Sequence, residues 1–158
     1  MIVRTYLEIH DPAALRPAAP PRLEGVEVAR AEPPDGELNR WFYVEVGAAH
    51  NWIDNLGRSE ADWQAWAERV ETWVATVDGR RAGYYELRVD GGNVEVAYFG
   101  LLAAYQGAGL GGFLLTHAVR RGFELAPRVW LHTNTQDGAA ALPNYKARGL
   151  RPFRTETL

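Results

Sequence analysis

The sequence of 158 residues contains no cysteine, and this absence excludes several kinds of chemistry. Disulfides, thiolate metal sites and covalent cysteine intermediates all require a thiol. The four histidines, at positions 10, 50, 117 and 132, are scattered, and no two of them have the helical spacing of a metal-binding pair. We therefore expect a protein without a metal site.

Long apolar runs and a strong charge imbalance are also missing. No apolar run approaches the roughly 20 residues that a membrane span requires. The formal net charge of -3 gives no electrostatic reason to expect nucleic acid or an anionic membrane as a partner. Charged residues appear as early as Arg4 and Glu8, so the apolar core of a signal peptide is absent. We expect a cytoplasmic protein.

The composition and the length predict one globular domain. Hydrophobic residues make up 47% of the chain and charged residues 23%, as in soluble globular proteins. The chain is long enough to bury a real core, and it contains no internal repeat. We expect a single domain over residues 1–158, in which residues 1–25 are an N-terminal extension with an added strand.

Strand patterns dominate the first two thirds of the chain. Apolar alternation or short apolar runs predict strands over residues 4–9, 26–31, 72–77, 81–89 and 94–102. A proline-rich stretch over residues 11–25 predicts an irregular connection. Asp78-Gly79 and the segment 90–93 are turn signals, so the last three of these strands form an antiparallel meander.

Helical spacing and aromatic residues mark the region between the second and third strands. A short helix that ends near Gly47 and a second helix over about 60–70 are expected, the second one introduced by a capping pattern at Ser59 and Asp62. Three of the six tryptophans lie between positions 52 and 66. These aromatic side chains belong to the core, line an acceptor pocket, or form a dimer surface.

A cluster of four glycines, at positions 107, 109, 111 and 112, follows the strand over 94–102. Apolar residues at helical spacing follow it, so the glycines open a helix that extends to about Leu125. Unpaired amide groups at the start of a helix attract negative charge, which favours a phosphate ligand. After this helix we expect a buried strand over 129–133, parallel to the strand before the glycines, a helix over about 139–148 and a final strand over 151–157.

The pattern Gln106-x-x-Gly109-x-Gly111 resembles the acyl-CoA-binding signature of the Gcn5-related N-acetyltransferase (GNAT) superfamily. The meander before it and the segment Tyr145-x-x-x-Gly149-Leu150 after it are also similar to that family. The resemblance covers roughly four-fifths of the chain. It implies the α/β (α+β) acyl-CoA N-acyltransferase fold, a mixed and mostly antiparallel sheet flanked by helices on both faces.

A competing pattern, Gly107-x-Gly109-x-x-Gly112, fits the fingerprint of dinucleotide-binding folds. That fingerprint requires an early parallel strand and an acidic residue at the end of the next strand. Here the preceding strands are antiparallel, and residues 129–133 are apolar or neutral. A Walker loop is excluded because no Lys-Ser/Thr pair follows the glycines. Coenzyme A is the ligand that fits.

The resemblance assigns cofactor-binding roles to two segments. In the family, loop amides hold the pyrophosphate, which here implies the residues Gln106, Gly107, Ala108, Gly109, Leu110 and Gly111, with Gly112 at the helix start. The preceding strand pairs with the pantetheine arm, a role that falls on Phe99, Gly100, Leu101 and Leu102. Similar enzymes often carry an asparagine seven residues before the tyrosine; here that position is Gly138, so Asn134 is the remaining candidate contact.

The resemblance also implies chemistry, the attack of an amine on acetyl-CoA without a covalent enzyme intermediate. Tyr145 matches the tyrosine that similar enzymes place near the sulfur, as an acid or as a hydrogen-bond donor. Glu95 is the first candidate for the general base, because strand alternation puts it on one face with Ala97 and Phe99. Glu86, His132 and a bound water are the alternatives.

The acceptor is expected to be a small-molecule or peptide amine, and the aromatic-rich segment leaves a homodimer as an open alternative. The alternative function is a non-catalytic acyl-CoA-binding sensor or interaction domain. Another acyl-CoA as donor, or a hydroxyl acceptor, is a further possibility that the residues leave open.

Overall fold

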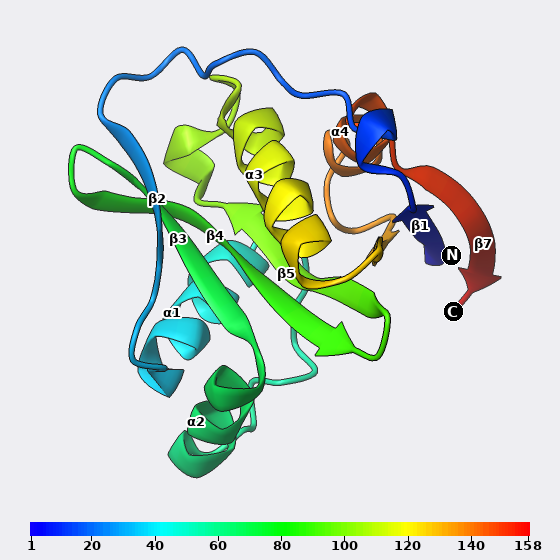
Figure 1. Ribbon diagram of the computed structural model, residues 1–158. Helices are drawn as coiled ribbons and strands as arrows, with labels where there is room; N and C mark the ends of the chain where they lie inside the picture. Colours follow the sequence, from blue (N-terminus) through cyan, green and yellow to red (C-terminus); the bar gives the residue numbers. More distant parts are fainter.

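Seven strands and four α-helices make up the fold in the computed structural model, which describes residues 1–158. The strands are β1 (Val3–Ile9), β2 (Val26–Arg30), β3 (Glu71–Val77), β4 (Arg80–Asp90), β5 (Asn93–Leu101), β6 (Arg128–Asn134) and β7 (Arg151–Thr157). The helices are α1 (Gly36–Gly47), α2 (Glu60–Arg69), α3 (Leu110–Leu125) and α4 (Ala141–Ala147). Two short 3-10 turns, η1 (Pro12–Ala14) and η2 (Ala103–Tyr105), complete the order shown in Figure 1.

All seven strands form one sheet in the order β2-β3-β4-β5-β6-β1-β7. Every neighbouring pair is antiparallel except β5 and β6, which are parallel. Their parallel pairing covers only three residue pairs, from Asn93 with Arg128 to Glu95 with Trp130. The mixed, mostly antiparallel sheet and the parallel crossover through α3 are thereby confirmed.

The strand near the N-terminus is an inner strand. β1 pairs with β6 on one side and with β7 on the other. The backbone amide of Leu158 also donates to the carbonyl of Ile2 at 2.9 Å, so the first and last residues of the sequence lie close together. The segment predicted to add a strand therefore completes the half of the sheet that contains β6 and β7.

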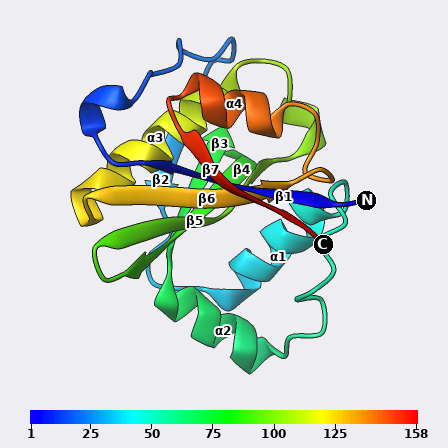
Figure 2. The same ribbon diagram turned by 90° about the vertical axis from the view of Figure 1, so that its right-hand side faces the viewer.

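The helices cover both faces of the sheet, α1 and α2 on one face and α3 and α4 on the other (Figure 2). Ser59 and Asp62 form the predicted capping box at the start of α2, each side chain accepting from the other residue's backbone amide. The longest helix, α3, has 16 residues, and none of the helices has the length and apolar composition for crossing a membrane.

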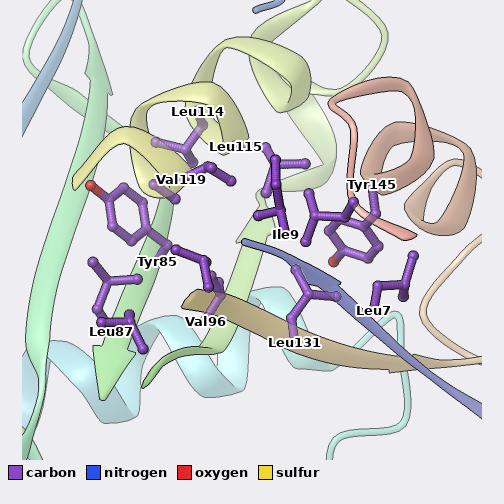
Figure 3. Close-up of a cluster of buried hydrophobic side chains, with 14 of the residues drawn as sticks. Leu7, Ile9, Tyr85, Leu87, Val96, Leu114, Leu115, Val119, Leu131 and Tyr145 are labelled. Atoms are coloured by element: carbon purple, nitrogen blue, oxygen red, sulfur yellow. The ribbon is translucent and has the colours of Figure 1, made fainter. Parts of the chain in front are cut away.

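The main core lies between the sheet and the helices α3 and α4 (Figure 3). The apolar stripe of α3 supplies Leu114, Leu115, Ala118 and Val119, all with no exposed surface. Tyr145 of α4 belongs to the same cluster as Leu131 of β6. A smaller cluster on the opposite face joins Phe42 and Val46 of α1 to Tyr84 of β4. Packing on both faces fixes the positions of β4 and β5.

A β-bulge interrupts the pairing of β4 with β5. Tyr98 pairs with Glu86 and Val96 pairs with Leu87, so Ala97 has no partner in the ladder. A bulge adds one residue to a strand and reverses the alternation of the side chains beyond it. Accordingly Val94 and Val96 belong to the main core. Beyond the bulge it is Phe99, and not Tyr98, that packs against this core.

Candidate active site

A cavity of about 460 Å³ lies where β5 and β6 separate. Their pairing ends at Glu95 and Trp130, whereas β5 continues to Leu101. The walls come from both faces of the sheet, since they include Tyr43 of α1 and Tyr145 of α4. The bulge at Ala97 lies just beyond the last parallel pair and bends β5 there. The separation of the two strands therefore opens the space for a ligand.

The loop before α3 presents a row of free backbone amides. The N–H groups of residues 107 to 112 donate no hydrogen bond within the chain, since the first intrahelical donor is Phe113 to Gly109. Gly107 and Gly109 have φ angles of +82° and +84°, a conformation that glycine adopts without strain. Space around Gly107 is open, with no atom within 4 Å of where a Cβ would lie. Such a row fits a pyrophosphate.

Gly112 lies in the first turn of α3. Gly109 is the N-cap and the helix begins at Leu110, so Gly112 is the third helical residue. A Cβ on Gly112 would come within 2.6 Å of Arg148 Nη1 and 2.9 Å of the Ala18 Cβ. Close packing against these two residues is thus the reason for glycine at this position. Arg148 is brought to the helix N-terminus, where a cation attracts phosphate groups.

The irregular segment after β1 supports the glycine loop. The backbone amide of Arg22 donates to the carbonyl of Ala108 at 2.7 Å, and its guanidinium Nη2 donates to the carbonyl of Gly107 at 2.8 Å. These two hydrogen bonds fix the orientation of the peptide carbonyls toward Arg22, so the N–H groups of the loop remain available to a ligand. No motif in the sequence indicated this contact, because it joins residues 85 positions apart.

The cofactor-binding residues that the sequence predicted are largely brought together. Lining the cavity are Phe99, Gly100, Leu101, Gln106, Gly107, Gly111, Gly112 and Asn134. Ala108 and Gly109 lie outside the lining, although their amides belong to the free row. The side chain of Leu110 is fully buried in a cluster with Val77 and Ala82, so only its amide can reach a ligand.

Leu102 does not fit the predicted role in pairing with pantetheine. Its amide donates to the carbonyl of Ala82 at 2.8 Å, and its carbonyl accepts from the amide of Tyr105 at 3.0 Å. Both backbone groups are used within the chain, and the side chain packs on the α1 face. Glycine is required at position 100 for a reason other than a break in strand pairing. A Cβ there would come within 2.4 Å of Val46 Cγ1.

Tyr145 lies at the centre of the cavity wall. Its side chain is 7% exposed and packs edge-on against Phe99, with ring centroids 6.2 Å apart. Burial, reinforced by the negative charge of Asp137, raises the pKa of Tyr145 well above its usual value. Because of this raised pKa the hydroxyl stays protonated. It makes no hydrogen bond with the rest of the chain, so it is free to donate to a ligand.

The prediction that Glu95 shares a strand face with Phe99 is wrong, because of the bulge at Ala97. Beyond Ala97 the alternation is reversed, so Glu95 and Phe99 lie on opposite faces of β5. Glu95 is absent from the cavity wall, and its carboxylate Oε1 accepts from Arg88 Nε at 3.1 Å. Its other oxygen lies 3.9 Å from His132 Nε2.

His132 is the candidate base that reaches the cavity. Partial desolvation of the side chain, which is 37% exposed, and secondarily the charge of Arg4 lower the pKa of His132. The imidazole is therefore neutral at neutral pH and able to accept a proton. The carboxylate of Glu95 lies 3.9 Å from His132 Nε2 and can stabilise the protonated imidazole. Glu86, the other alternative, is 1% exposed, lies outside the cavity wall and accepts hydrogen bonds on both oxygens.

Residues that were not predicted as catalytic or cofactor-binding also line the cavity. His50, Asn51, Trp52, Asp54, Tyr43, Tyr98, Asp137 and Asn144 all line it. Three of them, Tyr43, Trp52 and Tyr98, form the end of the cavity on the α1 face. The tryptophan-rich stretch had suggested an acceptor pocket as one possibility, and Trp52 does line the cavity, whereas Trp63 and Trp66 do not.

The mixed sheet, the separation of β5 from β6 and the row of free amides before α3 are together typical of acyl-CoA N-acyltransferase folds. A comparison of the sequence with known families identifies the family. The sequence pattern of the acetyltransferase (GNAT) family matches residues 37–150. This match covers more than two thirds of the chain. The protein belongs to the GNAT acetyltransferase family, as the motif around the glycine loop predicted. A search among curated proteins finds no match.

Solved structures share the fold at low sequence identity. A GCN5-related N-acetyltransferase from Kribbella flavida superposes with a TM-score of 0.69 and 22% identity, over 97% of this chain and 55% of that one. A second one, from Sphaerobacter thermophilus, gives 0.68 and 15%, over 98% and 49%. An IAA acetyltransferase from Bacillus cereus gives 0.62 and 23%, over 82% and 79%. The chain thus spans about half the length of the first two.

Proposed function

We propose that this protein transfers an acetyl group from acetyl-CoA to an amine by direct attack. The observation that carries the proposal is that one cavity joins the glycine loop, Tyr145 and His132. Membership of the GNAT family supports acyl transfer in general. The absence of cysteine from the sequence removes the residue type best suited to a covalent acyl intermediate.

Acetyl-CoA supplies an activated thioester, and the free amides of residues 107 to 112 are suited to its pyrophosphate. Arg22 keeps the loop in shape through the carbonyl of Gly107, and Arg148 adds positive charge beside Gly112. The β6-facing edge of β5 beyond Glu95 has no strand partner and can pair with an extended ligand arm.

His132 serves as the base in this proposal. The neutral imidazole accepts the proton that the attacking amine loses, and the carboxylate of Glu95, 3.9 Å away, stabilises the charged ring. Tyr145 donates a hydrogen bond to the departing sulfur. Full proton transfer is disfavoured, because an ordinary thiol has a pKa of about 8.5 and the pKa of Tyr145 is raised far above that.

Isothermal titration with acetyl-CoA, combined with a thiol-release assay on an amine panel, tests the proposal. The Tyr145→Phe variant is expected to bind acetyl-CoA within about twofold of the parent and to release thiol about 100-fold more slowly, as for loss of a single donor to developing charge. Tyr105→Phe is the matched control, since Tyr105 lies outside the cavity wall. Absence of acetyl-CoA binding at millimolar concentration would refute the proposal, and binding without turnover on any amine would favour a sensor.

A further inference from the structure

The end of the cavity on the α1 face is a wall of three aromatic rings, which we call the aromatic wall: Tyr43, Trp52 and Tyr98. The ring centroids are 5.7 Å apart for Tyr43 and Trp52, 5.6 Å for Tyr43 and Tyr98, and 5.3 Å for Trp52 and Tyr98. Each ring therefore touches the other two. The faces of aromatic rings attract organic cations because their π-systems are negative at the centre.

Hydrogen bonds hold this wall in place. The backbone amide of Asn55 donates to Tyr43 Oη at 3.1 Å, and its side-chain amide donates to Tyr98 Oη at 2.7 Å. Trp52 Nε1 donates to Asp137 Oδ1 at 3.2 Å. All three rings are thus fixed before a ligand arrives, and little side-chain entropy is lost on binding.

Among the residues that line the cavity near the aromatic wall, the charged side chains are the carboxylates of Asp54 and Asp137. Asp54 lines the cavity two residues from Trp52 and has neither a hydrogen bond nor an ion pair. Asp137 accepts from Thr133 Oγ1 at 2.7 Å, from the Asn134 amide and from Trp52, all neutral donors, so no cation compensates its charge.

The remaining titratable groups of the cavity do not change this balance. The only lining residue with a permanent positive charge, Arg4, is 3.4 Å from the carboxylate of Glu156. His132 is neutral at neutral pH, as described above. The Nδ1 atom of His50, another lining residue, is buried without a hydrogen-bond partner.

We propose that the acceptor carries a positively charged group in addition to the amine that reacts, and that the aromatic wall with Asp54 and Asp137 binds this group. The inference rests on the proposed acetyl transfer, because it names the substrate class for that reaction. The nitrogen that attacks a thioester must be uncharged, whereas rings and carboxylates favour a charged one. The nitrogen at the wall is therefore not the reacting one. A diamine meets both requirements, with one amine near His132 and the other at the wall.

Three acceptors of equal length test the inference: diaminobutane, aminobutanol and aminobutanoate, which share one amine and differ in the group at the far end. We expect kcat/KM to fall from diaminobutane to aminobutanol by about tenfold and further to aminobutanoate. The Asp54→Asn variant should reduce the preference for diaminobutane over aminobutanol by about threefold to tenfold. Asp90→Asn, which changes an exposed carboxylate at the end of β4, is the matched control.

Binding of diaminobutane measured by titration calorimetry without acetyl-CoA gives a readout independent of turnover. The Trp52→Leu variant should weaken this binding about tenfold. Equal turnover of the three acceptors, or a preference for aminobutanoate, would overturn the inference and leave acetyl transfer standing. No turnover of any acceptor together with selective binding of diaminobutane would contradict the transfer reaction and support the cation site. Neither turnover nor selective binding would overturn both.

Discussion

Glu86 is a carboxylate in the wrong place for a base, and replacing it tests this reading. Its side chain is 1% exposed beneath α1 and α2. Asn39 Nδ2 donates to one carboxylate oxygen and Trp66 Nε1 to the other, both at 2.7 Å. Burial raises the pKa of Glu86 from 4.5 to about 7, an effect that these two hydrogen bonds only partly offset.

The raised pKa has a definite effect on stability. A group with a higher pKa in the folded state stabilises the fold below its unfolded pKa, and this contribution is lost as the pH rises through the folded pKa. For Glu86 the window runs from 4.5 to about 7. A difference of about 2.5 units corresponds to roughly 3 kcal/mol of unfolding free energy, almost all of it lost by about pH 8.

The Glu86→Gln variant removes this pH dependence, because an amide does not ionise. Asn39 can turn its amide so that its oxygen accepts from the new NH2 group, while Trp66 still donates to the oxygen. The stability of the variant relative to the parent should therefore rise by about 3 kcal/mol between about pH 4 and about pH 8, which is roughly 6 to 12 °C in Tm.

Urea unfolding of both proteins at a series of pH values measures this difference, with thiol release measured on the same samples. Glu27→Gln on β2, an exposed strand position, is the control and should show a flat difference. A Glu86→Gln variant whose relative stability does not change with pH would refute the reasoning about burial. A variant that folds stably and loses turnover would return Glu86 to the list of candidate bases.

Three other predictions concern the site and its support. Gly100→Ala should destabilise the fold by about 1–3 kcal/mol, because its Cβ would come within 2.4 Å of Val46 Cγ1, and adding Val46→Ala should restore part of the loss in urea unfolding. Arg22→Gln should weaken acetyl-CoA binding about threefold to tenfold in calorimetry, whereas Arg16→Gln on the same segment should not. For the parent, kcat/KM should rise with pH through a pKa below 6.5 that belongs to His132. His132→Gln should lower kcat/KM about 100-fold and abolish this step, which His117→Gln should preserve.

Much of the fold could be predicted because its signals are local. Apolar alternation, the Asp78-Gly79 turn and the Ser59 capping box each lie within one element or one turn, and the structure has strands, a hairpin and a helix there. The glycine loop is local too, and its amides are free as expected. Signals of this kind need no knowledge of the neighbouring segments.

Contacts between distant segments could not be predicted in this way. Arg22 holds the glycine loop from 85 residues away, and Asn55 fixes the ring of Tyr98 from a loop between two helices. β1 is an inner strand because it can pair with both β6 and β7, which no pattern within residues 3–9 reveals. The aromatic wall is likewise assembled from α1, the following loop and β5.

The bulge at Ala97 explains most clearly where local reasoning ends. Strict alternation along β5 would place Glu95 with Phe99, and it led to Glu95 as the first candidate base. One unpaired residue reverses the alternation, so that Phe99 packs with Tyr145 on the face covered by α3 and α4, whereas Tyr98 lies in the aromatic wall on the other face. The same irregularity lies where β5 leaves β6 and opens the cavity. Both the side-chain assignment along β5 and the place where the cavity opens thus follow from one bulged residue, which the apolar alternation of β5 does not reveal.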